Sequence, residues 1–247
     1  MGRLPSFRER AAPHTLPEKM DGETDFATLK SCLASLATVN ALSLGYRPTL
    51  RFVAGRAAAH KEPRPFRVLD VGSGYGDTLR VIARRFERDR VRSELTGADL
   101  NPLCVKAARS TGEKPGKPVV LAYVTRDARE LSALGEAPDV IMSSLLTHHL
   151  EDDDVVEFLR WMDATAKSGW LINDLYRSRF AAEGFRLLAT LLRRHPYVRH
   201  DGPVSFARAF RRADWERLLA AAGISGAKIF IGAPFRLCVA KVRGDGA

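Results

Sequence analysis

The chain has 247 residues, a length that suits one α/β domain with a modest extension. Its 39 basic and 29 acidic residues give a formal charge of +10, but the basic residues are spread along the chain, which favours a solvated surface over a nucleic-acid-binding face. Three distant cysteines fit neither a disulfide framework nor a zinc site, and no stretch approaches the roughly 20 apolar residues of a membrane helix. We therefore expect a cytoplasmic protein without a membrane span.

The first 63 residues precede the first expected strand. Residues 1–25 mix proline, glycine and charge without a sustained apolar period, so we expect a flexible leader there. Apolar residues recur at helical spacing from 26 to about 44, and Pro48 is well placed in the first turn of a second helix over 49–59. This helical segment, 26–63, is expected to form a lid over a ligand crevice, with plain core cover as the alternative.

From residue 64 onward, apolar runs of strand length alternate with helical patterns. The expected strands are 66–71, 94–100, 119–124, 139–143, 169–175, 227–231 and 235–242. The expected helices are 75–86, 102–109, 152–167, 180–194 and 212–222. This alternation predicts a seven-stranded, mostly parallel sheet with helices on both faces, and the last two runs predict an antiparallel hairpin at its edge.

The most informative motif follows the first expected strand. Residues 68–77 read Val-Leu-Asp-Val-Gly-Ser-Gly-Tyr-Gly-Asp, so an apolar run breaks into Gly72, Gly74 and Gly76. Glycines at a sharp strand-to-helix turn allow a ligand to approach the backbone, which indicates a nucleoside site. Dinucleotide-binding folds have a further glycine where this chain has Asp77, whose carboxylate would repel a pyrophosphate. The motif therefore argues against NAD as the ligand.

This stretch resembles the first motif of the class I S-adenosylmethionine-dependent methyltransferases, and the resemblance spans roughly residues 64 to 243. It implies a Rossmann-like α/β fold for the domain 64–247, S-adenosylmethionine as cofactor and methyl transfer as activity. It also implies that the methionine part of the cofactor faces the following residues: Asp70, Gly72, Ser73, Gly74 and Gly76.

Acidic residues follow the next two expected strands. Asp99, followed by Leu100, ends the second strand, where a carboxylate can accept hydrogen bonds from both ribose hydroxyls of a nucleoside. The position of Asp99 supports an adenosine-containing ligand, but it does not distinguish S-adenosylmethionine from NAD, because NAD-binding folds place a carboxylate similarly. The resemblance places Asp127 and Ala128 against the adenine ring, with an exposed loop carboxylate as the alternative, and we expect Ser143 to border the cofactor.

Two histidines, His148 and His149, follow the fourth expected strand. Ligands of open α/β sheets bind beyond the carboxyl ends of the strands, so these side chains should border both cofactor and acceptor. A neutral imidazole can take the proton of a phenol or hydroxyl as its oxygen attacks a methyl group, which makes both histidines candidate catalytic bases. The segment also resembles small-molecule methyltransferases of the ubiquinone-pathway type. A structural role and a divalent-metal site are the alternatives, and we assign no metal.

Polar and aromatic side chains gather near the end of the fifth expected strand and before the last helix. The candidate acceptor contacts are Asn173, Asp174, Tyr176, Arg177 and Phe210, with turn, capping and core-packing roles as alternatives. The segment 203–210 could close the acceptor pocket, with Phe206 and Phe210 as aromatic walls.

A motif that is absent from the chain bears on the class of acceptor. Methyltransferases of nucleobase amines tend to carry Asn- or Asp-Pro-Pro-aromatic after the fourth strand, where residues 143–146 read Ser-Ser-Leu-Leu. This absence argues against a nucleic-acid partner. The two histidines and the aromatic-bearing segments favour a small aromatic or quinol-like acceptor methylated on oxygen. An RNA methyltransferase, a NAD-type reductase and a non-catalytic cofactor-binding module are the alternatives, and the oligomeric state does not follow from the sequence.

Overall fold

The computed structural model describes residues 5–135, 137–191 and 195–243, and the statements below concern this part of the chain. The expected leader 1–25, the expected helix 180–194 and the expected domain 64–247 therefore extend partly outside the described residues.

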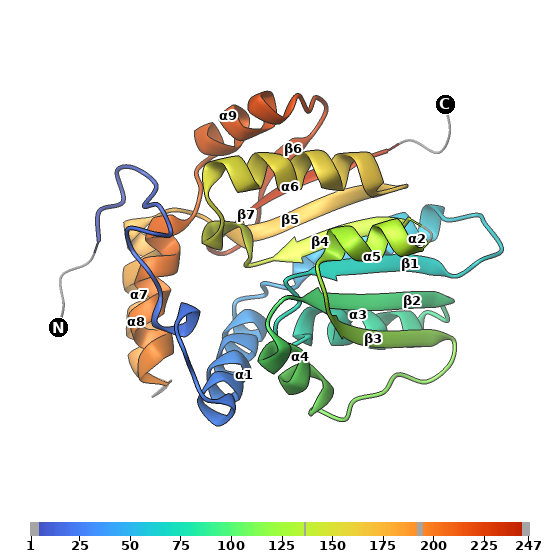
Figure 1. Ribbon diagram of the computed structural model, residues 1–247, viewed down its shortest axis with the longest axis horizontal. Coiled ribbons are helices and arrows are strands. Elements are labelled where there is room, and N and C mark those ends of the chain that lie inside the picture. The colour runs from blue at the N-terminus through green and yellow to red at the C-terminus, as the bar shows by residue number, and fades with distance from the viewer. Residues whose placement is uncertain (1–4, 136, 192–194, 244–247) are drawn as a thin grey trace.

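A seven-stranded sheet forms the centre of the molecule, with strand order β3-β2-β1-β4-β5-β7-β6 (Figure 1). The strands are β1 (Phe66–Val71), β2 (Ser93–Asp99), β3 (Val119–Thr125), β4 (Val140–Ser144), β5 (Gly169–Leu175), β6 (Lys228–Ala233) and β7 (Arg236–Val242). β1 to β5 are parallel, and β7 runs antiparallel to both of its neighbours, β5 and β6. The prediction of a mostly parallel sheet with an antiparallel edge hairpin is confirmed.

Helices cover both faces of this sheet (Figure 1). They are α1 (Phe26–Leu42), α2 (Arg47–Ala59), α3 (Asp77–Arg88), α4 (Pro102–Arg109), α5 (Ala128–Leu134), α6 (Asp152–Thr165), α7 (Arg179–Leu191), α8 (Pro196–Arg208) and α9 (Arg212–Ala222), with 3₁₀ turns η1 (Lys19–Asp21) and η2 (Thr147–His149). Val53 of α2 and Phe86 of α3 pack in one core cluster with β1 to β4. Leu159 of α6 and Trp215 of α9 pack in another with β5 and β7, so each face has its own core.

Two helices were not expected from the sequence. α5 is short and begins at Ala128, and the side chain of its N-cap residue Asp127 accepts a hydrogen bond from the Arg129 amide at 2.8 Å. α8 contains Gly202 and Pro203, residues that argue against a helix when the sequence is considered alone. Gly202 is required by packing, because a Cβ atom there would collide with the ring of Phe185.

Residues 5–25, where we expected a flexible leader, pack against the body of the protein. Phe7 is buried in a cluster with side chains of α7 and α8. Arg10 pairs with Asp152 at 2.6 Å, and the carboxylate of Asp201 accepts hydrogen bonds from two backbone amides of η1 at 2.9 and 3.1 Å. Polar contacts hold most of the segment in place, so it packs without an apolar period in its sequence.

The two N-terminal helices occupy different positions. α2 lies on the sheet, where Thr49 Oγ1 accepts a hydrogen bond from Asn173 at 2.9 Å. α1 lies beyond the carboxyl ends of the parallel strands (Figure 1). Its side chains Leu33 and Leu36 line a cavity described below. Within the expected lid, α1 is thus placed over a cavity and α2 covers the core.

No single helix in the described ranges is long and apolar enough to cross a membrane. α1 and α2 meet the length and composition of a span only when taken together, and they are bent by 76° at their junction.

Candidate active site

A cavity of about 610 Å³, here called the loop cavity, opens where β1, β2 and β4 end, with α1 on its other side. The candidate cofactor residues that line it are Asp70, Gly72, Ser73, Gly74, Asp99, Leu100, Asp127 and Ala128. Ser143 does not line it, because its Oγ donates to the Val71 carbonyl at 3.0 Å, and Ser144 lines the cavity instead. Gly76 also lies outside the lining and forms the start of α3.

The glycine loop has a conformation that other residues rarely adopt. Gly72 and Gly76 have φ angles of 68° and 72°, and a Cβ atom on Gly76 would collide with the Tyr123 ring. The Gly74 amide donates to Asp99 Oδ2 at 2.8 Å, and the Asn101 amide donates to Asp99 Oδ1 at 2.9 Å. The end of β2 is thereby tied to the loop that follows β1.

Three polar atoms in the wall of the loop cavity are buried and have no hydrogen-bond partner among the described residues. They are Asp70 Oδ1, Ser73 Oγ and Ser144 Oγ. Burial, together with the nearby carboxylates of Asp77 and Asp99, raises the pKa of Asp70 well above its ordinary value. Because buried polar groups in proteins are normally paired, these atoms indicate a ligand with polar groups of its own, including a cation near Asp70.

A second cavity of about 350 Å³, here called the apolar cavity, adjoins the loop cavity. The two cavities share the following lining residues: Glu18, Met20, Leu36, Asn40, Leu145 and His149. Most of the remaining wall is apolar and comes from α1, α7, α8 and the turn before β7, with Phe185, Phe206 and Phe235 as aromatic members. A molecule in one cavity would therefore meet a molecule in the other beside Glu18 and His149.

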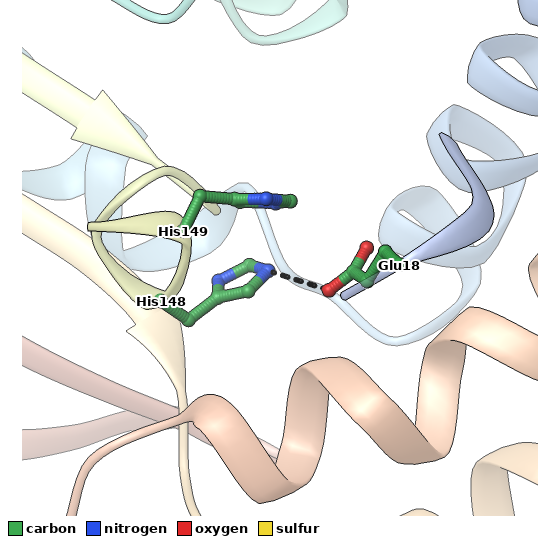
Figure 2. Close-up of side chains that lie close together, drawn as sticks. All are labelled: Glu18, His148 and His149. Atoms are coloured by element: carbon green, nitrogen blue, oxygen red, sulfur yellow. Dashed lines mark ion pairs between the residues drawn. The ribbon is translucent and has the colours of Figure 1, made fainter. Parts of the chain in front are cut away.

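His148 lies at the wall of the apolar cavity and is held by a buried carboxylate. Its Nδ1 is 2.7 Å from Asp174 Oδ1, and its Nε2 is 3.8 Å from Glu18 Oε1 (Figure 2). Asp174 also accepts hydrogen bonds from the His148 amide, the Leu175 amide and the Thr147 hydroxyl. Burial by itself would raise the pKa of Asp174, but His148 and these hydrogen bonds outweigh it and lower the pKa. An ionised Asp174 places the ring proton on Nδ1, which leaves the lone pair on Nε2.

His149 lies between the two cavities, beside a buried arginine. Its Nδ1 is 3.1 Å from Asp21 Oδ1 and 3.2 Å from Arg208 Nη2. The Arg208 guanidinium also lies 2.9 Å from Asp21 Oδ2 and 3.4 Å from Glu18 Oε1. Burial raises the pKa of Glu18 although His149 and Arg208 oppose the shift. We call Glu18, Asp21, His148, His149 and Arg208 the histidine cluster.

The histidine cluster has donor atoms suited to a metal ion. Atoms of Glu18, His148 and His149 lie within 4.8 Å of one another (Figure 2). The guanidinium of Arg208, however, already supplies a positive charge beside Glu18 and His149. A divalent cation would be repelled by this neighbour, so the arrangement favours proton transfer over metal binding.

None of the residues expected to contact the acceptor lines either cavity; they are Asn173, Asp174, Tyr176, Arg177 and Phe210. Asn173 bonds to Thr49, and Arg177 pairs with Asp214 at 2.8 Å. Phe210 is fully buried and packs with Tyr176 in the core cluster of α9. β5 lies between β4 and β7, so its polar side chains are satisfied inside the protein. Of the segment 203–210, Phe206 does line the apolar cavity.

Sequence reasoning missed Glu18 and Arg208. Glu18 belongs to a segment without periodicity, and Arg208 lies in the proline-containing helix α8. For Arg208, the one signal in the sequence was the expectation that the segment 203–210 borders the acceptor. For Glu18 the sequence offered no signal.

Comparison with known proteins identifies the family of the central part of the chain. Residues 68–169 match the sequence profile of a family described as a methyltransferase domain, and this match includes the glycine loop, Asp99 and both histidines. These residues form a class I methyltransferase domain. The cofactor of this class is S-adenosylmethionine, whose ammonium and hydroxyl groups suit the unpartnered atoms of the loop cavity.

Individual relatives are distant. Ajmaline N-methyltransferase from Rauvolfia serpentina is 28% identical over 108 residues, which make up 44% of this chain and 35% of that protein. The chain thus spans about a third of the length of this curated relative.

Solved methyltransferase structures share the fold of this domain at low sequence identity. Magnesium protoporphyrin IX methyltransferase from Synechocystis, with bound SAM, has a TM-score of 0.52 at 14% identity over 92% of this chain and 88% of its own. The plantazolicin methyltransferase BpumL in complex with SAH has a TM-score of 0.58 at 16% identity over 86% of this chain and 94% of its own. These similarities show the fold.

Proposed function

We propose that the chain transfers the methyl group of S-adenosylmethionine to an oxygen atom of a small aromatic or quinol-like acceptor. The observation that carries the proposal is the shared wall between the loop cavity and the apolar cavity. S-adenosylmethionine supplies a methyl group activated by its positively charged sulfur. The protein then aligns the two molecules, and such alignment can account for most of the catalysis in a direct displacement.

The loop cavity would hold the methyl donor. Asp70 would accept hydrogen bonds from the methionine ammonium, and Asp99 would accept them from the ribose hydroxyls, because each carboxylate lies in the cavity wall. Leu100, Asp127 and Ala128 would lie beside the adenine ring. The hydroxyls of Ser73 and Ser144, which lack partners among the described residues, would gain partners on the donor.

Binding of the donor should release protons because of Asp70. Its raised pKa favours the neutral carboxyl in the free protein, whereas the methionine ammonium favours the ionised form. We expect S-adenosylhomocysteine, which carries the same ammonium, to bind more weakly as the pH falls through the raised pKa. Calorimetry in two buffers of different ionisation enthalpy measures the proton release.

Asp70→Asn should lower the affinity at least about tenfold and reduce this release. Asp127→Asn is the control for the proton release alone and should leave it unchanged, because the hydrogen bond from Arg129 lowers the pKa of Asp127 and keeps that carboxylate ionised. An undiminished proton release in Asp70→Asn would exclude Asp70 as its source.

The apolar cavity would hold the acceptor, with its reactive oxygen toward the histidine cluster. Its aromatic wall suits a ring, and its volume of about 350 Å³ suits a small molecule more than a nucleic-acid chain. The Nε2 lone pair of His148 can take the proton of the attacking hydroxyl, and His149 borders the place where the two cavities meet.

The test is methyl transfer from isotope-labelled S-adenosylmethionine to a panel of phenols, catechols and hydroquinones. Single replacements His148→Gln and His149→Gln should each lower turnover about 10²-fold and leave the affinity for S-adenosylhomocysteine unchanged. His14→Gln is the matched control, since His14 is exposed and pairs only with Glu151 among the described residues. The proposal fails if the unmodified protein labels no oxygen in the panel.

A further inference from the structure

Arg236 has an unusual environment at the wall of the apolar cavity. It is the first residue of β7, is only 4% exposed and lines the apolar cavity but not the loop cavity. Its Nη2 donates to Asn40 Oδ1 at 2.6 Å, whereas its Nη1 is buried without a hydrogen-bond partner among the described residues. A buried donor on a charged group is costly when it lacks a partner.

The protein itself supplies no carboxylate partner for Arg236 within the described ranges. Asp174 and Asp77 lie close enough to act on its charge, but Asp174 is occupied by His148 and Asp77 accepts the Tyr46 hydroxyl at 2.6 Å. The other buried arginines of the described chain each form an ion pair with a carboxylate; they are Arg80, Arg177 and Arg208. Arg236 therefore differs from them in having its charge unpaired at a cavity.

We propose that Arg236 binds a carboxylate on the methyl acceptor and so determines which acceptors enter the apolar cavity. This inference rests on the proposed function, in which the acceptor occupies that cavity. Nη1 would donate a charge-assisted hydrogen bond to the carboxylate, while the bond to Asn40 keeps the guanidinium plane in position.

The acceptor class follows from the three parts of the cavity wall. The carboxylate lies at Arg236, the ring lies among Phe206 and Phe235, and the reactive hydroxyl lies at the histidine cluster. The acceptor is thus a hydroxyaryl carboxylic acid.

A matched pair of probes tests this inference without methyl transfer. The probes are 3,4-dihydroxycinnamate and 3,4-dihydroxycinnamyl alcohol, which share the catechol ring and end in a carboxylate and in an uncharged hydroxymethyl group, respectively. Calorimetry on the protein saturated with S-adenosylhomocysteine should show at least about tenfold tighter binding of the carboxylate, since a charge-assisted hydrogen bond contributes about this much.

Arg236→Met should abolish the preference, and Arg236→Lys should retain part of it. Arg47→Met, at an exposed position, is the control and should keep the full preference. Equal binding of both probes to the unmodified protein, binding of neither probe, or an unchanged preference in Arg236→Met would each overturn the inference. So would a loss of S-adenosylhomocysteine affinity in Arg236→Met, because the arginine would then serve the methyl donor.

These outcomes are separate from those of the proposed function. A carboxylate preference that depends on Arg236, found in a protein that transfers no methyl group, would support the binding site and refute the activity. Methyl transfer without the preference would support the activity and refute the role of Arg236. The comparison of the two probes on the unmodified protein needs no variant and can overturn the inference by itself. If Arg236→Met does not fold, Arg236→Lys tests the residue, and an unchanged preference in that variant would overturn the inference.

Discussion

Asp174→Asn is expected to lower kcat by about 10²- to 10⁴-fold while the affinity for S-adenosylhomocysteine stays unchanged. Asp174 touches neither cavity, so it acts through His148 as a positioning residue. The carboxylate keeps the ring proton on Nδ1 and the lone pair on Nε2, which faces Glu18 across the edge of the apolar cavity.

An asparagine cannot reproduce this arrangement. Donors face both oxygens of Asp174: Nδ1 of His148 and the Leu175 amide on one side, the Thr147 hydroxyl and the His148 amide on the other. An amide group must direct its NH₂ toward one of these sides. If the NH₂ faces the imidazole ring, the ring proton moves to Nε2 and the base is lost. If the NH₂ faces the other side, two donors oppose each other there, because the backbone N–H of His148 cannot become an acceptor.

The measurement is single-turnover methyl transfer with an acceptor found by the panel. Asp139→Asn is the matched control, because Asp139 is equally buried and pairs with Arg64 away from both cavities. This control should lose stability without losing kcat per folded molecule. A folded Asp174→Asn protein with undiminished kcat would refute the positioning role.

Arg208→Met is expected to lower the free energy of unfolding by about 3 kcal/mol near neutral pH. Arg208 is 1% exposed, pairs with Asp21 at 2.9 Å and donates to the His148 carbonyl at 3.1 Å. Its removal leaves Glu18 buried without the neighbouring cation. Because Glu18 and Asp21 belong to the N-terminal segment, residues 5–25 should also become sensitive to proteases.

The effect of Arg208→Met should depend on pH. Burial raises the pKa of Glu18 in the folded protein, so the folded state is favoured at low pH and this contribution is lost as the pH rises through the raised pKa. Without Arg208 the pKa rises further, so the penalty should be larger at pH 8 than at pH 5.

Urea denaturation at both pH values measures this difference. Arg212→Met, at a side chain that is 58% exposed, should change stability by less than about 0.5 kcal/mol. An equal loss of stability at both pH values would show that Arg208 acts by packing alone.

The architecture was predictable because its signals are local. Apolar runs alternating with helical patterns specify strands and helices, and the glycine loop has backbone angles that favour glycine. The same locality explains the misses. α8 contains Gly202 and Pro203, which the sequence marks as helix breakers, yet packing against Phe185 and the core retains the helix.

The sequence by itself determined the fold class and the position of the glycine loop, because strand periodicity and glycine conformation depend on neighbouring residues. Only the tertiary structure decided the roles at the acceptor side. Asp174 follows Asn173 at the end of a strand, and nothing in that pattern shows that one orients His148 while the other anchors Thr49. Arg236 meets Asn40 across 196 positions of sequence. Such contacts arise when separate elements pack together, so no local pattern records them.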